Sequence, residues 1–79
     1  MEYFVRDFND DSTLEGPLSF THADREARKL SSENDSGLSE MVTFQYGVMH
    51  YVGTYVRGTL RYKGLRSRQA SLHNLPPTL

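Results

Sequence analysis

Residues 41–63 constrain the fold most, because this stretch contains neither a proline nor an acidic residue. It holds four of the five tyrosines and most of the valines, and glycines interrupt it at intervals. β-Branched and aromatic side chains suit a pleated, half-buried surface, and spaced glycines supply turns. The pattern therefore predicts a three-stranded antiparallel meander over residues 41–63.

Two glycine-containing pairs fix where this meander turns. Gly47-Val48 suits a two-residue hairpin loop with glycine first, and Arg57-Gly58 suits the next turn. The first turn would pair Tyr46 with Met49. Because side chains alternate between faces, the larger apolar set should share the face that meets the core: Val42, Phe44, Tyr46, Met49, Tyr51 and Tyr55. The alternative is one long bent strand, which the glycines disfavour.

A single helix is expected between residues 21 and 30. Thr21 is a good N-cap, and Asp24 can complete a capping-box-like start and pair with Arg28 one turn later. One apolar stripe at helical spacing should lie on the sheet, and it consists of Ala23, Ala27 and Leu30.

The remaining segments complete the expected order. Residues 2–8 read as a first strand, and residues 13–19, which include Gly16-Pro17, read as a loop or a short edge hairpin. The fold class is then α+β, with one helix packed on a small antiparallel sheet in the order β-α-β-β-β. Residues 1–63 should form a single domain and residues 64–79 a basic, flexible tail.

Composition places the chain among small cytoplasmic proteins. It has no cysteine and no apolar run near the roughly 20 residues of a membrane span. No basic-then-apolar signal pattern opens the chain. The expected location is the cytoplasm, which is the host cytoplasm for a phage protein, with no membrane partner.

Charge is divided unevenly between the two halves. Residues 1–40 carry all ten acidic and four basic residues, a net −6, whereas residues 41–79 carry five basic residues and no acid, a net +5. The acidic half could imitate a nucleic-acid backbone towards a protein partner. The candidate acidic contacts are Asp7, Asp10, Asp11 and Glu15, with Glu2 adding charge.

The basic half suggests a second contact surface. Arginines can neutralise phosphates while tyrosines stack on bases. The candidate set for a partner or nucleic acid is Tyr55, Arg57, Arg61, Tyr62, Lys63, Arg66 and Arg68. The slightly acidic isoelectric point, about 6.3, argues against a dedicated nucleic-acid binder.

Catalytic and metal-binding signals are weak. The alternation of Asp7, Asn9, Asp11 and Thr13 resembles the opening of a calcium loop, but the glycine and glutamate that such a loop needs are missing. The three histidines are scattered, and no phosphate loop or triad pattern is legible. We expect no metal, no cofactor and no enzymatic activity.

In format, residues 1–63 resemble small phage and mobile-element proteins of the anti-CRISPR type. The resemblance is carried by the opening strand EYFVRDF, the acidic turn NDDST, the alanine-spaced helix FTHADREARKL and the tyrosine-rich meander. It implies a stoichiometric inhibitor that binds a Cas protein or complex through charged surface residues.

The sequence therefore predicts a small non-enzymatic protein-interaction module, in the form of a phage-type inhibitor of a host nucleic-acid-handling complex. Tyrosine and arginine are the residue types that dominate interface hot spots. The alternative is a nucleic-acid-binding accessory domain that uses the basic half. A homodimer through an exposed sheet edge also stays open.

Overall fold

The computed structural model describes residues 1–7 and 14–64. They form one helix and one five-stranded antiparallel sheet, which confirms the α+β class. The elements are β1 (Tyr3–Asp7), β2 (Glu15–Leu18), α1 (Phe20–Glu33), β3 (Leu38–Gln45), β4 (Val48–Val56) and β5 (Thr59–Lys63). The expected meander corresponds to β3, β4 and β5. The segment expected as a loop or short edge hairpin contributes an additional strand, β2. Residues 65–79, which make up nearly all of the expected tail, lie outside the described residues.

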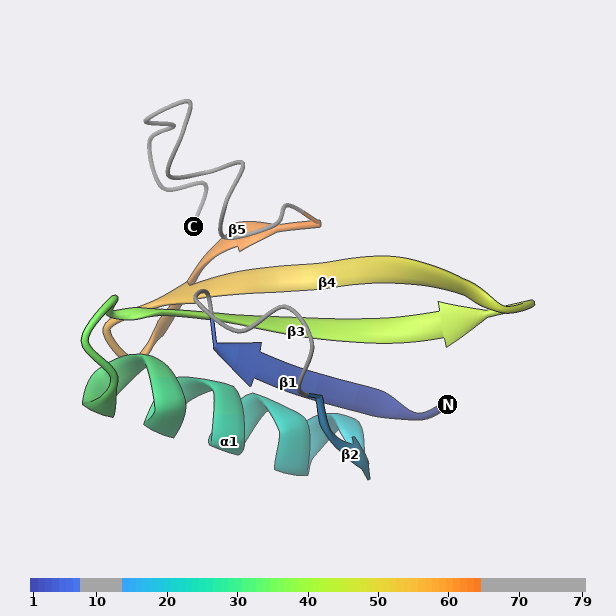
Figure 1. The fold of residues 1–79 in the computed structure, drawn as a ribbon, viewed down its shortest axis with the longest axis horizontal. Coiled ribbons are helices and arrows are strands. Elements are labelled where there is room, and N and C mark those ends of the chain that lie inside the picture. The colour runs from blue at the N-terminus through green and yellow to red at the C-terminus, as the bar shows by residue number, and fades with distance from the viewer. Residues whose placement is uncertain (8–13, 65–79) are drawn as a thin grey trace.

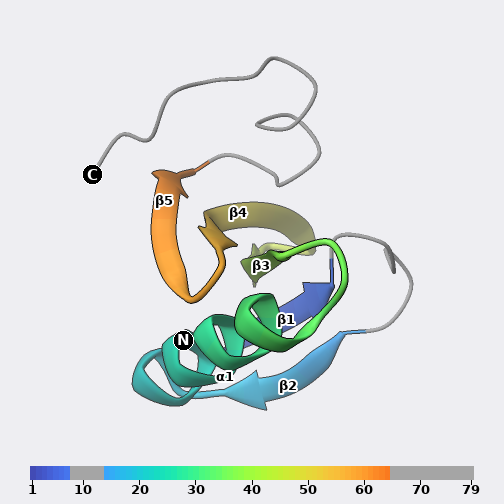
Figure 2. The ribbon, with the colours of Figure 1, turned by 90° about the vertical axis from the view of Figure 1, so that its left-hand side faces the viewer.

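The sheet has the strand order β2-β1-β3-β4-β5 and curls around the helix (Figures 1 and 2). Helix α1 contacts all five strands. Register shifts occur in the β1–β2, β3–β4 and β4–β5 pairings. Since a bulge bends a strand and increases its twist, these three irregularities allow five short strands to wrap around one helix. No helix in residues 1–7 and 14–64 has the length and apolar character to cross a membrane.

Helix α1 begins earlier than the sequence predicts. The N-cap is Ser19, whose hydroxyl accepts a hydrogen bond from the backbone N–H of His22 at 3.2 Å, so the expected cap at Thr21 is wrong. A serine hydroxyl satisfies an unpaired N–H of the first turn as well as a threonine would. The apolar stripe is confirmed, because Ala23 and Ala27 are fully buried and Leu30 packs against the same core.

The first turn of the meander lies one residue earlier than expected. Gln45 pairs with Val48, so the two-residue loop is Tyr46-Gly47 and not Gly47-Val48. Both loop residues have positive φ, 51° at Tyr46 and 76° at Gly47. This is the pattern of a type I′ turn with glycine second. The Arg57-Gly58 turn is confirmed, with φ values of 46° and 88°.

The predicted core face is wrong as well. Val42, Phe44, Met49 and Tyr51 do share one face, since Phe44 pairs with Met49 and Val42 with Tyr51, but that face points away from the helix. The helix instead packs on the face that carries Met41, which is fully buried in the core cluster. Both placements of the turn keep these four residues on one face, so the error lies in assigning the larger apolar set to the side of the helix.

A bulge separates two tyrosines that simple alternation places together. Val42 pairs with Tyr51 but Met41 pairs with Gly53, so one extra residue, Val52, stands in β4. Tyr55 therefore joins the helix-facing core while Tyr51 lies on the opposite face. The core consists of Val5, Ala23, Ala27, Met41 and Tyr55.

Candidate interaction surface

Exposed apolar side chains gather at the end of the β3–β4 hairpin. The exposed fractions are 40% for Phe44, 103% for Tyr46 and 57% for Val48. We call residues 44–49 the hairpin tip. Figure 1 shows this tip projecting past the helix and past the N-terminus of the chain. A single exposed apolar residue is ordinary, but a cluster on one projecting element is typical of an interaction site.

The tip presents apolar groups on both of its faces. Phe44 and Met49 form a cross-strand pair on the face turned away from the helix, and Val48 lies opposite Gln45 on the other face. The Phe44 ring is braced by the Phe4 ring of β1, with centroids 5.5 Å apart in an edge-to-face arrangement. The base of the tip is therefore packed, while its end is open.

Tyr46 occupies a position that favours other residues. The left-handed backbone conformation is costly for most side chains, and asparagine, aspartate or glycine normally fills this place in a type I′ turn. The Tyr46 side chain is fully exposed, so burial does not compensate the strained backbone. The neighbouring Gly47 faces open space, with no heavy atom within 4 Å of a Cβ built on it. The fold alone gives no reason for a tyrosine here.

The tip also lies in a chargeless part of the chain. Residues 41–56 contain no Asp, Glu, Lys or Arg. Polar side chains in the tip and next to it include the amide of Gln45 and the imidazole of His50. A contact made by this surface would depend on apolar burial and shape, and only weakly on salt.

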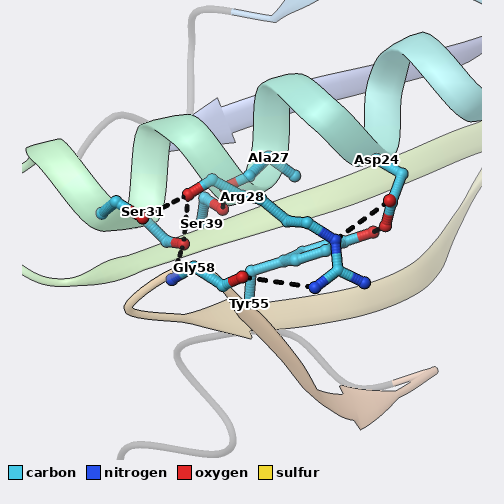
Figure 3. A network of polar contacts seen from close by, with 8 residues as sticks. Asp24, Ala27, Arg28, Ser31, Ser39, Tyr55 and Gly58 are labelled. Atoms are coloured by element: carbon cyan, nitrogen blue, oxygen red, sulfur yellow. Dashed lines mark hydrogen bonds and ion pairs between the residues drawn. The ribbon is translucent and has the colours of Figure 1, made fainter.

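A polar network fastens the helix to the far end of the meander (Figure 3). The Tyr55 hydroxyl donates to Asp24 Oδ1 at 2.6 Å, and Arg28 Nε donates to Asp24 Oδ2 at 3.0 Å. Arg28 also donates to the Gly58 carbonyl at 3.2 Å, and the Gly58 N–H donates to Ser31 Oγ at 2.8 Å. The expected Asp24–Arg28 pair is thus present, but it belongs to a link between α1 and the β4–β5 turn.

This network shifts the titration of its members. Burial and then the hydrogen bond to the Asp24 carboxylate raise the pKa of Tyr55 well above its ordinary value. Burial alone would raise the pKa of Asp24, but the hydrogen bonds from Tyr55 and Arg28 outweigh it and lower that pKa. The folded state therefore holds Tyr55 neutral and Asp24 charged.

We expect Tyr55 to make the fold sensitive to alkali. An unfolded tyrosine loses its proton near pH 10, whereas folded Tyr55 keeps it, so stability should fall by up to about 1.4 kcal/mol per pH unit above pH 10. Tyr55→Phe should lower the free energy of unfolding by about 1.5 kcal/mol at pH 7, because the hydrogen bond to a charged acceptor is gone. The stability of this variant should not fall above pH 10 in the way that the stability of the wild type does. Urea denaturation between pH 7 and 11 measures both effects.

The matched control for this experiment is Tyr46→Phe. It makes the same chemical change at a fully exposed position, so its stability should follow the wild type at every pH. Because Tyr46→Phe leaves the Asp24–Tyr55 hydrogen bond intact, a difference between the two variants isolates the effect of Tyr55. Equal alkaline slopes for wild type and Tyr55→Phe would contradict the prediction.

A buried ion pair lies on the sheet face turned away from the helix. Arg6 Nε donates to Glu40 Oε1 at 3.0 Å, and the two side chains are 5% and 2% exposed. The Arg6 guanidinium lies 5.9 Å from the centroid of the Tyr51 ring and within 3.5 Å of its hydroxyl. The pair joins β1 to β3 at a register position where the two residues stand opposite each other.

The residues of the predicted acidic face are not placed as one group. Asp7 is half-buried and accepts a 3.4 Å hydrogen bond from Ser36, while Glu15 is exposed on the edge strand β2. Asp10 and Asp11 lie outside the described residues, as does most of the calcium-like motif. Within residues 1–7 and 14–64, no three His, Cys, Asp or Glu side chains are grouped to hold a metal ion.

The predicted basic end is placed only in part. Arg57 is exposed at the β4–β5 turn, and Arg61 and Lys63 follow along β5, with Tyr62 half-buried between them. Tyr55 is 1% exposed and hydrogen-bonded to Asp24, so its ring is not available to stack on a base. Arg66 and Arg68 lie outside the described residues.

Sequence reasoning missed the tip as a contact surface because the face with Phe44 and Tyr46 is the larger and more apolar one and was therefore expected to meet the core. The chargeless run of residues 41–56 was the signal that could have marked it. Comparison with known proteins gives no match among family models, curated proteins or solved structures.

Proposed function

We propose that this chain is a non-enzymatic protein-interaction module that binds its partner through the hairpin tip. The observation that carries the proposal is Tyr46, a fully exposed aromatic residue in a left-handed turn position. Tyrosine is among the residue types that supply most binding energy at protein interfaces. Phe44 and Val48 extend the exposed apolar surface around it.

The more specific form of the proposal is a stoichiometric inhibitor acting in the host cytoplasm on a nucleic-acid-handling complex, for example a Cas complex. The resemblance of residues 1–63 to small anti-CRISPR-type proteins supports this form. The uneven charge of the two halves supports it as well, because a partner of that kind presents strongly basic grooves.

The first experiment is a tagged pull-down from bacterial lysate, run with and without nuclease, with three versions of the chain. The wild type should retain a protein partner at stoichiometric yield after nuclease treatment. The triple reversal of Arg57, Arg61 and Lys63 to glutamate should retain it too. If recovery collapses on nuclease treatment and in this triple variant, nucleic-acid binding by the basic half replaces the proposal.

The third version of the chain, Tyr46→Asn, should separate binding from folding. It creates the Asn-Gly pair that a type I′ turn prefers, so stability should rise by up to about 1 kcal/mol. Removing a hot-spot tyrosine costs about 2 kcal/mol of binding, or roughly 30-fold in affinity. Calorimetric titration with the recovered partner measures the affinity, and urea denaturation measures the stability.

Tyr46→Phe is the control, since it keeps the ring and should keep most of the affinity. A Tyr46→Asn chain that is stable and binds as tightly as the wild type would remove the hairpin tip from the proposal.

A further inference from the structure

We propose that the hairpin tip inserts end-on into an uncharged, apolar cleft of a partner protein, and this inference rests on the proposed function. The first support is the distribution of apolar groups around the tip. Phe44 and Met49 lie on one face, Val48 on the other, and Tyr46 at the end. Docking on a flat surface would cover one face and leave the other in water. Insertion into a cleft covers both.

The second support is the absence of charge. Residues 41–56 comprise the tip, all of β4 and the part of β3 that leads into the tip, and they carry no Asp, Glu, Lys or Arg. A nucleic-acid groove is lined by phosphates and is normally met by arginine and lysine. An apolar protein cleft needs no such neutralisation. A protein cleft therefore fits the tip better than a nucleic acid does.

The third support is preorganisation. A two-residue type I′ turn closes the hairpin, and the Phe4 ring packs edge-to-face against Phe44 at its base. The β3–β4 pairing continues from Gln45 and Val48 at the tip to Leu38 and Val56 at the other end. A projecting element that is already ordered loses little conformational entropy on binding. Such an element suits insertion better than a loop that must first order.

Within residues 1–7 and 14–64, a second copy of this chain offers little exposed apolar surface outside the tip to receive it. Within the described residues, the exposed large apolar side chains outside the tip are Met1 and Phe20. The Phe20 ring stacks edge-to-face on Tyr3, with centroids 5.3 Å apart, and so lies on the surface of the helix start. The cleft that receives the tip therefore belongs to a different protein.

The test uses the photo-crosslinking residue benzoylphenylalanine as the probe, placed in the full chain at one position at a time. The test positions are 44, 46 and 48, and the control position is 25 on the exposed side of the helix. Each chain is irradiated in bacterial lysate at 0.1 M and 1 M NaCl. The crosslinked partner residues are mapped by mass spectrometry.

We expect all three tip positions to crosslink to the same partner, at sites that converge on one region without charged residues. Position 25 should give less than a tenth of that yield, and the yield should change less than twofold with salt.

Crosslinks from 44 alone or from 48 alone would overturn insertion while leaving tip binding intact. A second copy as the crosslinked product, or a tenfold loss in 1 M NaCl, would overturn the stated partner. If the pull-down recovers a partner but no tip position crosslinks, the inference fails and protein binding stands. If nothing is recovered, both fail.

Discussion

Replacing Ala27 with glutamate should unfold this domain. Ala27 is 0% exposed in the core between α1 and the sheet. The Ser39 hydroxyl of β3 donates to the Ala27 carbonyl at 2.7 Å, which shows how closely the helix backbone approaches the strand. A longer side chain has no space there, and overpacking alone costs about 1–3 kcal/mol. A buried carboxylate without a partner adds several kcal/mol more.

The expected loss exceeds about 4 kcal/mol, whereas a domain of this size is stable by about 4–12 kcal/mol in total. Circular dichroism and urea denaturation should show an unfolded or barely folded chain at 25 °C. The control is Arg25→Glu, on the exposed side of the same helix, which should change stability by no more than about 0.5 kcal/mol. A cooperative Ala27→Glu transition at the wild-type urea midpoint would mean that the helix does not pack on the sheet at this residue.

The helix stripe was predictable because alanines spaced by four can only be explained by close packing of one helix face. The meander and its second turn were predictable for a similar reason, since Arg57-Gly58 stands between two runs rich in β-branched and aromatic residues. These parts of the fold follow from local rules that agree with one another.

The first turn shows where local rules stop being sufficient. A lone glycine can be the first residue of a type II′ turn or the second of a type I′ turn. Choosing Gly47-Val48 avoids a tyrosine with positive φ, but the chain places Tyr46 there. The two choices shift the pairing of β4 against β3 by two residues, so they change the loop but leave the same side chains on each face of β3. The hairpin tip was missed for a separate reason, because apolar size was taken to mark the core-facing side of the meander.

Bulges and edge strands are the other features that the pattern did not predict. Simple alternation assumes a regular ladder of paired residues. The extra residue Val52 in β4 therefore places the side chains that follow it on the opposite faces from those that alternation predicts. Strand β2 has four residues, and one of them is Pro17, which local rules assign to loops or edges. Its pairing with β1 depends on contacts that only the assembled sheet provides.

Replacing Arg6 with methionine should be the second most damaging substitution. Methionine keeps the apolar stem but removes the guanidinium that donates to Glu40 at 3.0 Å. The Glu40 carboxylate then stays buried, at 1% exposure for the residue, without that partner. Breaking a buried ion pair on one side costs about 3–5 kcal/mol. Urea denaturation at pH 7 measures the loss, and Lys29→Met, at an exposed helix position, is the control and should be nearly neutral.

The double variant Arg6→Met with Glu40→Leu decides what the pair does. A buried ion pair is often no more stabilising than apolar residues of similar size, so the double variant should recover at least half of the single variant's loss. The pair stands opposite in β1 and β3, and Phe44 lies four residues further along β3, about 13 Å from Glu40. Partner binding through the hairpin tip should therefore survive in the double variant. If stability recovers but binding does not, the pair has a second role, in setting the orientation of the hairpin. If the loss is not recovered at all, then the ion pair itself stabilises the fold, and charge contributes to stability on the sheet face turned away from the helix.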